Sequence, residues 1–130
     1  MHLVLDTSIV IELQRNNTQI INKIEELKDI YPAPPKIAFI TYFEFLEGIS
    51  NKSEKNQQMS RVFIELFDMM NITKSTAQTL ITLRKKYSLP IPDLLIAAQT
   101  MENNGILLTK DKDFEKITEI EKIILSRTSH

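Results

Sequence analysis

The sequence contains no cysteine, only two glycines and only two histidines. Without cysteine, the chain has no disulfides, thiolate metal sites or cysteine nucleophiles, and a reducing compartment such as the cytoplasm is expected. Gly48 and Gly105 lie too far apart for a phosphate-binding loop or a dinucleotide motif. The histidines are His2 and His130, near the two ends of the chain, which disfavours a triad of serine, histidine and aspartate. Catalysis is therefore left to carboxylates, hydroxyls, lysines and arginines.

An excess of charge of one sign and a long apolar run are also missing. The net charge is −1, so any contact with nucleic acid must be local rather than made by a broad basic field. Asp6 interrupts the first apolar run after a few residues, and no later run approaches membrane-spanning length, which excludes a signal peptide and a spanning helix. The 130 residues are 42% hydrophobic, so we expect one globular domain over residues 1–130, in the cytoplasm and without membrane contact.

Short apolar runs alternate with segments of helical periodicity along the whole chain. Residues 3–5, 37–40 and 106–108 read as buried strands, and residues 70–72 and 123–125 as further short strands. Between them, apolar residues recur at helical spacing. This alternation predicts an α/β fold with a mainly parallel sheet.

One expected helix is apolar nearly all round, and another is amphipathic with an apolar stripe. Residues 42–49 are apolar on most of the helical circumference, so this helix is either central to the core or in contact with a partner. Residues 59–67 carry methionine and phenylalanine at helical spacing, which we interpret as a stripe that packs in the core.

Acidic residues follow the expected strands or begin the expected helices. Asp6 follows the first strand, and Asp111 and Asp113 follow the strand at 106–108. Glu44 comes three residues after Thr41, which is the spacing of a capping box, and Asp93 lies in the first turn of an apolar helix. Helix capping or turn formation is the alternative explanation for each acid. In an open α/β sheet, however, the carboxyl ends of the strands border the functional crevice.

The coincidence of these acids needs an explanation. With 17 acids among 130 residues, chance places acids at four such points in roughly 0.0003 of random sequences, and capping preference raises that figure about tenfold at each of two positions. Carboxylates gathered in one crevice repel each other unless a cation lies between them, and oxygen ligands suit Mg²⁺ or Mn²⁺. Such a site is typical of phosphodiester hydrolysis.

The sequence resembles the PIN-domain ribonucleases over nearly its whole length, and among them the VapC-like toxins of toxin–antitoxin pairs. The segments that carry the resemblance are Leu3-Val4-Leu5-Asp6-Thr7-Ser8, Thr41-x-x-Glu44-x-x-x-Gly48, Asp93-x-x-Ile96-Ala97-Ala98 and Thr109-x-Asp111-x-Asp113-Phe114. The resemblance implies a three-layer α/β/α fold, whose central, mainly parallel sheet has four to five strands. It also implies a site for Mg²⁺ or Mn²⁺ and cleavage of single-stranded or loop RNA.

The resemblance assigns roles to individual residues. Asp6 and Asp93 would be the principal metal ligands, and Glu44 and Asp111 would be ligands or would orient the attacking water, with Asp113 as the alternative fourth acid. Thr7 or Ser8 would assist at the metal site. Candidates for phosphate contacts are Arg15, Lys110, Lys112 and the cluster Arg84-Lys85-Lys86, although a helix dipole also explains that cluster.

The same resemblance implies partners and leaves alternatives. A homodimer and a cognate antitoxin protein, bound through an apolar groove, are expected. One alternative is a PIN nuclease of RNA processing or repair, but such proteins usually carry extra modules. The other is a PIN scaffold that binds RNA or protein without cutting, against which the acids in all four segments weigh.

Overall fold

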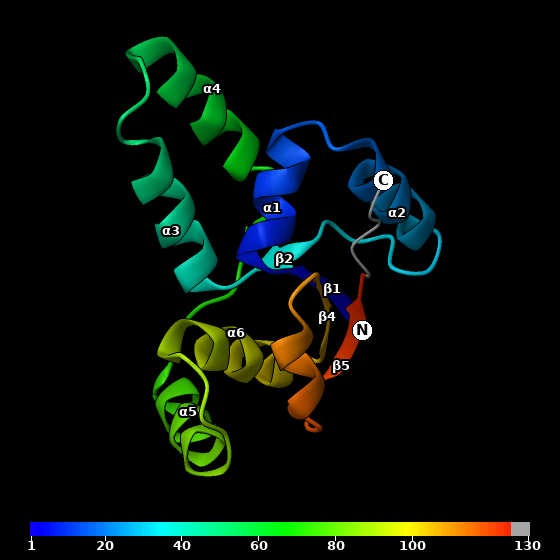
Figure 1. Ribbon diagram of the computed structural model, residues 1–130, viewed down its shortest axis with the longest axis vertical. Helices are drawn as coiled ribbons and strands as arrows, with labels where there is room; N and C mark the ends of the chain where they lie inside the picture. Colours follow the sequence, from blue (N-terminus) through cyan, green and yellow to red (C-terminus); the bar gives the residue numbers. More distant parts are fainter. Residues whose placement is uncertain (126–130) are drawn as a thin grey trace.

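The computed structural model describes residues 1–125, so His130 lies outside the described part of the chain. Strands and helices alternate from the first residues onward, as the sequence predicts (Figure 1). The strands are β1 (His2–Leu5), β2 (Lys36–Ile37), β3 (Asp68–Met69), β4 (Gly105–Thr109) and β5 (Glu121–Ile124). The helices are α1 (Thr7–Gln14), α2 (Thr18–Lys28), α3 (Phe39–Ile49), α4 (Glu54–Ile64), α5 (Lys74–Lys86), α6 (Ile91–Glu102) and the 3₁₀ helix η1 (Lys112–Lys116).

The five strands form one parallel sheet in the order β3-β2-β1-β4-β5. From β1 the chain builds outward through β2 to β3, and then returns to place β4 on the other side of β1. The longest pairing joins β1 to β4, from His2 opposite Gly105 to Leu5 opposite Leu108. The order therefore reverses between β1 and β4, and such a reversal opens a crevice at the carboxyl ends of the two strands.

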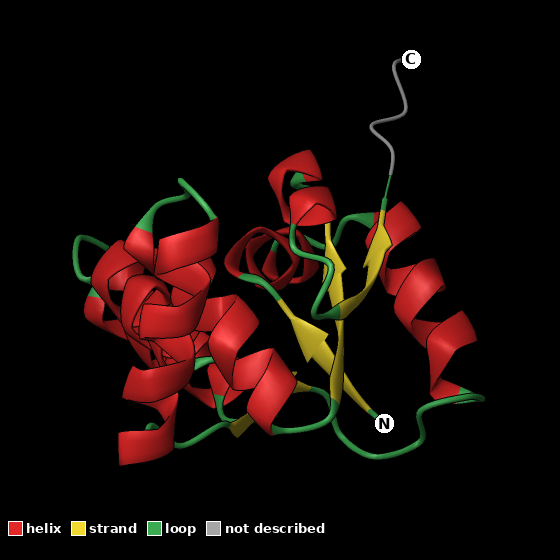
Figure 2. Ribbon diagram, turned by 90° about the horizontal axis from the view of Figure 1, so that it is seen from below, coloured by secondary structure: helices red, strands yellow, loops and turns green. Residues whose placement is uncertain are grey.

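Helices cover both faces of the sheet, which confirms the expected three-layer fold (Figure 2). Side chains alternate along a strand, so Leu3 and Leu5 pack on one face and Val4 on the other. The first face contacts α1, α2, α3 and α4, whose buried residues include Ile9, Ile24 and Phe45 among others. The second face is covered by α5, α6 and η1, through Leu83, Leu94, Ala97, Ala98 and Phe114.

The boundary between β2 and α3 differs from the prediction. Residues 37–40 were expected to form a strand, but β2 ends at Ile37 and the helix begins at Phe39. Ala38 is the N-cap and offers no side-chain cap. The amide of Phe39 instead donates to the buried Gln99 Oε1 on α6, at 3.0 Å. A hydrogen bond from a distant element therefore sets this boundary, and local sequence does not reveal it.

The apolar stripe of residues 59–67 does not pack wholly in the core, so that prediction is wrong. The helix α4 begins at Glu54, where Ser53 accepts from the amide of Asn56, and ends at Ile64. Phe63 and Phe67 pack against the core, but three other apolar side chains are well over half exposed: Met59, Val62 and Leu66. The adjacent strand β3 lies at Asp68–Met69 rather than at residues 70–72.

The pairing of β1 with β4 depends on close packing at Gly105. A Cβ at this position would lie 2.6 Å from Val4 Cγ2 and 3.2 Å from Thr100 Cγ2, so only glycine fits without a rearrangement. The left-handed residue after α6 is Asn104, with a φ of 51°.

Within residues 1–125, none of the helices has the length and apolarity needed to cross a bilayer.

Candidate functional site

Asp6 lies at the carboxyl end of β1, directly beside the end of β4. Its amide donates to the carbonyl of Leu108 at 3.2 Å, so the β1–β4 pairing continues up to the site. The carboxylate is buried and accepts three hydrogen bonds. They come from Ser8 Oγ at 2.8 Å, from the amide of Ile9 at 3.0 Å and from Thr109 Oγ1. Asp6 is therefore the N-cap of α1, as the capping alternative predicts, and its second oxygen also bonds to β4.

Burial raises the pKa of Asp6 above its ordinary value. The hydrogen bonds from Thr109, Ser8 and Ile9 favour the charged form and oppose this effect, while the nearby charge of Asp111 adds to it. A cap exposed to solvent would need neither the buried position nor the bond to Thr109. Asp6 therefore supplies one rigidly held carboxylate at the point where the strand order of the sheet reverses.

Glu44 comes from the second turn of α3, not from its first turn. Since α3 begins at Phe39, Thr41 is already inside the helix and the capping box expected between these two residues does not form. Instead, Thr7 Oγ1 donates to Glu44 Oε1 at 2.8 Å and lies 3.1 Å from Thr41 Oγ1. The first turn of α1 thereby fixes the half-buried Glu44 beside Asp6.

Asp93 lies in the first turn of α6, as predicted, and is half-buried. Burial and the charges of four other acids raise its pKa from 3.8 to about 6. In order of decreasing effect, these acids are Asp111, Asp113, Asp6 and Glu44. The structure therefore brings all the predicted acids together around Asp93, although they are up to 107 positions apart in the sequence.

Asp111 and Asp113 differ in their surroundings. The amide of Asp111 donates to Thr109 Oγ1 at 3.0 Å, and its carboxylate caps η1 by accepting from the amide of Asp113 at 2.9 Å. Asp111 is half-buried and affects the pKa of both Asp6 and Asp93. Asp113 is exposed, and its carboxylate lies 4.0 Å from Lys116 Nζ. Of the two, Asp111 is the more tightly held against the other acids.

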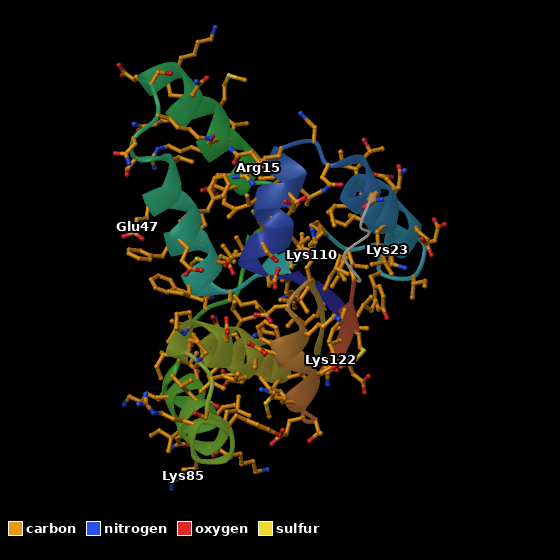
Figure 3. The ribbon with its side chains drawn as sticks, in the orientation of Figure 1. Arg15, Lys23, Glu47, Lys85, Lys110 and Lys122 are labelled. Atoms are coloured by element: carbon orange, nitrogen blue, oxygen red, sulfur yellow. The ribbon has the colours of Figure 1, made fainter. Side chains whose placement is uncertain are left out.

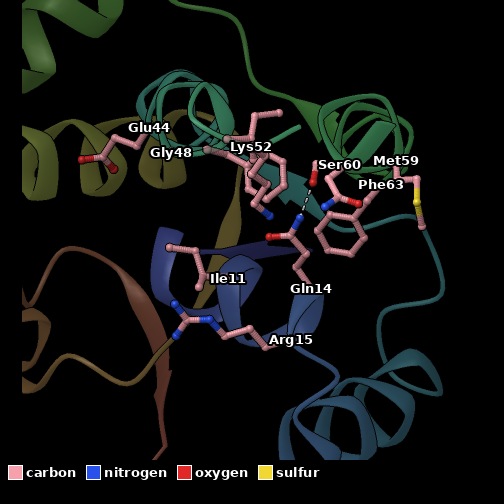
Figure 4. Close-up of a pocket in the computed structure, with 12 residues that line it drawn as sticks. Ile11, Gln14, Arg15, Glu44, Gly48, Lys52, Met59, Ser60 and Phe63 are labelled. Carbon is pink, nitrogen blue, oxygen red and sulfur yellow. Dashed lines mark hydrogen bonds between the residues drawn. The ribbon is translucent and has the colours of Figure 1, made fainter. Parts of the chain in front are cut away.

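A hollow of about 560 Å³ between α1, α3 and α4 reaches Glu44 but none of the other predicted acids (Figure 4). Glu44 and Arg15 line it from opposite sides, and Gln14 Nε2 donates to Ser60 Oγ beneath it at 2.6 Å. Gly48 also lines this hollow, and a Cβ there would meet no atom within 4 Å. Space inside the protein therefore does not require glycine at position 48.

The side chains predicted to contact phosphates lie around this region, and they differ in exposure and in ion pairing. Arg15 is exposed at the end of α1 and has no ion pair within residues 1–125. Lys110, in the loop after β4, lies 3.9 Å from Glu12, and Lys112 is exposed at the start of η1. Figure 3 shows Arg15 and Lys110 on the same side of α6.

Sequence reasoning missed the roles of Thr109 and Gln99. Thr109 is buried and joins two of the acids, because its hydroxyl donates to Asp6 and accepts from the amide of Asp111. Gln99 is buried on α6, where Nε2 donates to the carbonyl of Met70 at 2.9 Å and Oε1 accepts from Phe39. Position after a buried strand was a signal for Thr109, but one polar residue in an apolar helix was a weak signal for Gln99.

The chemistry of the side chains fits a hard divalent cation. The donors are carboxylate and hydroxyl oxygens, and a cation would offset both the burial of Asp93 and the repulsion from the other acids that raise its pKa. As the side chains stand, no three acids or histidines among residues 1–125 are gathered closely enough to hold an ion. The carboxylates would therefore have to approach one another when an ion binds.

Comparison with known proteins identifies the relatives of this chain. The sequence model of the PIN domain matches residues 3–120. A toxin–antitoxin complex from Klebsiella pneumoniae contains a similar chain, 28% identical, with a TM-score of 0.77 over 91% of this chain and 94% of that chain. No curated protein matches significantly.

Two other solved structures share the fold at lower identity. A chain of VapBC2 from Rickettsia felis, bound to a DNA fragment from its promoter, has a TM-score of 0.81 at 21% identity. A chain of VapBC-1 from nontypeable Haemophilus influenzae has a TM-score of 0.75, also at 21% identity. Both alignments cover 95% of this chain and 98% of the other.

Proposed function

The chain belongs to the PIN domain family, and on that premise we propose that it is a metal-dependent endoribonuclease that cuts single-stranded or loop RNA. Its fold and its similarity to a chain of a toxin–antitoxin complex support a VapC-like nuclease toxin. The observation that carries the proposal is the gathering of four acids around Asp93, whose pKa is raised to about 6 by burial and by the charges of these acids. Repulsion of this kind disfavours the fold without a cation, so a role in binding one explains why the acids are there.

In this proposal Asp6 and Asp93 hold Mg²⁺ or Mn²⁺, and Glu44 and Asp111 are further ligands or orient the attacking water. Asp113 is the alternative fourth acid. When bound, the ion supplies a nucleophile at neutral pH and stabilises the charge that develops on the phosphodiester. The carboxylates bind that ion and bring the water to one side of the phosphorus.

The hydroxyls act by fixing these carboxylates. Ser8 and Thr109 donate to the two oxygens of Asp6, which holds the plane of its carboxylate. Thr7 donates to one oxygen of Glu44, and the other accepts no hydrogen bond within residues 1–125. Because each fixed side chain loses little freedom on binding, the hydroxyls lower the cost of assembling the site.

Cations around the acids would bind the phosphates next to the bond that is cut. Arg15, Lys110 and Lys112 are the candidates. Arg15 and Lys112 form no ion pair within residues 1–125, whereas Lys110 already lies 3.9 Å from Glu12. These residues position the RNA, and specificity for a particular RNA must come from additional contacts with its bases or shape.

Two protein partners belong to the proposal. A homodimer is supported by exposed apolar side chains, including Phe39 at 41% and Phe43 at 48%, one turn apart on α3. An antitoxin segment would occupy the hollow between α1, α3 and α4, where Gly48 leaves room for another chain. We propose that the whole chain acts as one nuclease domain in the cytoplasm, in agreement with its lack of cysteine.

The decisive experiment maps RNA ends after expression of this protein and of its Asp6→Asn variant. We expect new ends only with the unsubstituted protein. Purified protein should cut RNA with Mg²⁺ or Mn²⁺, and Asp6→Asn or Asp93→Asn should lower the rate at least about 100-fold, because a lost ligand weakens metal binding. Undiminished cleavage in EDTA would contradict the metal mechanism. Binding of RNA without cleavage would favour the scaffold alternative, and a neighbouring gene for a DNA-binding antitoxin would favour the toxin over a processing or repair nuclease.

A further inference from the structure

A second pocket, of about 480 Å³, lies where α5 ends and α6 begins. Residues 84–91 line it, so its walls are the last turn of α5, the connecting loop and the first residue of α6. Three consecutive cations, Arg84, Lys85 and Lys86, occupy one wall. The hydroxyl of Ser88 is the other exposed polar side chain in the lining. The pocket is thus an open, positively charged cavity.

Only one of the three cations is neutralised. Lys86 Nζ lies 2.8 Å from Glu119 Oε2, and Tyr87 also donates to that carboxylate. These contacts lower the pKa of Glu119 to about 2, so it stays charged, and they attach the end of α5 to the loop before β5. Arg84 and Lys85 are exposed and form no ion pair within residues 1–125. Two positive charges therefore remain available to a ligand.

The pocket lies close to one of the acids along the chain. Its last lining residue, Ile91, precedes Asp93 by two positions, so at most roughly 7 Å of chain separates their backbones. In Figure 3, α6 lies between Lys85 on one side and Arg15 and Lys110 on the other. Asp93 belongs to the first turn of α6, and two cations that form no ion pair within residues 1–125, Lys85 and Arg15, lie on opposite sides of this helix.

We propose that this pocket binds backbone phosphates of the RNA on the α6 side of the bond that is cut. The inference rests on the proposed function and adds a second, remote contact for the same substrate. An RNA strand repeats its phosphates along its length, so one molecule supplies anionic groups both to the acids with their cation and to Arg84 and Lys85. An acidic protein surface lacks this regular spacing and would be repelled where the five carboxylates lie. Arg84 and Lys85 are positioning residues that do not touch the reacting phosphate.

The test compares two double variants that remove the same charge. Arg84→Gln with Lys85→Gln alters the pocket, whereas Lys55→Gln with Lys74→Gln removes two exposed lysines from α4 and from the first residue of α5. Both are made in the Asp6→Asn background with Mg²⁺, so that the RNA stays intact. The probe is a labelled single-stranded RNA of about 20 nucleotides, whose affinity is measured by fluorescence anisotropy at several salt concentrations; each phosphate contact contributes about 0.7 to the logarithmic salt slope.

We expect the pocket variant to lose affinity at least about five-fold at low salt and to reduce the salt slope by about 1.4, while the control changes both much less. Each single substitution should reduce the slope by about half as much. In the cleaving background, the pocket variant should raise KM more than it lowers kcat. Melting curves of all variants should agree, because the substituted side chains are exposed.

Three outcomes would overturn the inference: no binding of the RNA by the parent protein, equal affinity and slope for the two double variants, or a loss confined to kcat. The proposed function fails separately. If RNA binds through the pocket but the unsubstituted protein does not cut it, the pocket assignment stands and the nuclease assignment falls. If RNA is cut but the pocket variant binds it as the control does, the nuclease assignment stands and the pocket assignment falls.

Discussion

Replacement of Asp93 by asparagine should stabilise the protein in the absence of metal. The pKa of Asp93 is raised from 3.8 to about 6, and a displacement of about two pH units corresponds to about 3 kcal/mol in the free energy of unfolding at neutral pH. Because Asp93 is only half-buried, solvent screening reduces this to about 1–2 kcal/mol. Asparagine keeps the shape and deletes the charge, so Asp93→Asn should unfold at a temperature higher by roughly 3–8 °C.

The same effect has a defined dependence on pH. A carboxyl whose pKa is higher in the folded protein than in the unfolded chain destabilises the fold as pH rises from about 4 through 6. Below about pH 3 the group is largely protonated in both states, so Asp93→Asn and the unsubstituted protein should be nearly equally stable. Above about pH 7 nearly the full difference should be present. Chemical denaturation in EDTA at about pH 3 and about pH 7.5 measures the two limits.

The control and the role of metal complete this test. Glu47→Gln removes an exposed acid one turn beyond Glu44, and it should change stability by less than about 0.5 kcal/mol. Addition of Mg²⁺ should raise the melting temperature of the unsubstituted protein clearly and that of Asp93→Asn much less. If Asp93 only stabilised the first turn of α6, loss of its charge would destabilise the helix by about 0.3–1 kcal/mol and neither protein would respond to Mg²⁺. That pattern would refute the reasoning.

Four further predictions concern other parts of the molecule. Asp111→Ala should reduce RNA cleavage more than Asp113→Ala, and the opposite order would identify Asp113 as the fourth acid. Thr109→Val should lower the free energy of unfolding by about 1–2 kcal/mol, because a buried hydrogen bond is lost, and should also reduce the cleavage rate. The pKa of Glu119 is lowered to about 2, so its charge stabilises the fold at neutral pH. Glu119→Gln should therefore lower the free energy of unfolding by about 0.5–1 kcal/mol at pH 7, and this difference should disappear as pH falls through 4 toward 2. Light scattering at micromolar concentration should detect a dimer; a monomer that is unchanged on addition of antitoxin would contradict the proposed association.

The sequence predicted those features that depend on residues close together in the chain. The apolar runs at residues 3–5 and 106–108 lie in β1 and β4, since short and wholly apolar runs are typical of buried parallel strands. The first-turn position of Asp93 was also predicted correctly, because two prolines fix the entry to α6. The spatial grouping of the acids was expected from their common position at strand or helix ends and from family resemblance, and the structure brings them together.

Features that depend on distant contacts were not predictable. The start of α3 was placed too late, because the buried amide of Gln99, 60 positions away, bonds to Phe39. The apolar stripe of α4 was assigned to the core, but periodicity identifies an apolar face without showing what covers it. In both cases the missing information was the position of another element, which no short stretch of sequence contains.

The central place of β1 in the sheet has a consequence for the order in which a newly made chain acquires its site. Asp6 is synthesised before its partners Thr109 and Asp111, which follow more than 100 residues later. Until β4 has emerged and paired with β1, Asp6 has neither the hydrogen bond from Thr109 nor the neighbouring charge of Asp111. A chain that is still growing on the ribosome therefore lacks an assembled acidic site. An interruption of translation before β4 would release a product that has Asp6, Glu44 and Asp93 in its sequence but lacks Thr109 and Asp111, which complete the acidic site.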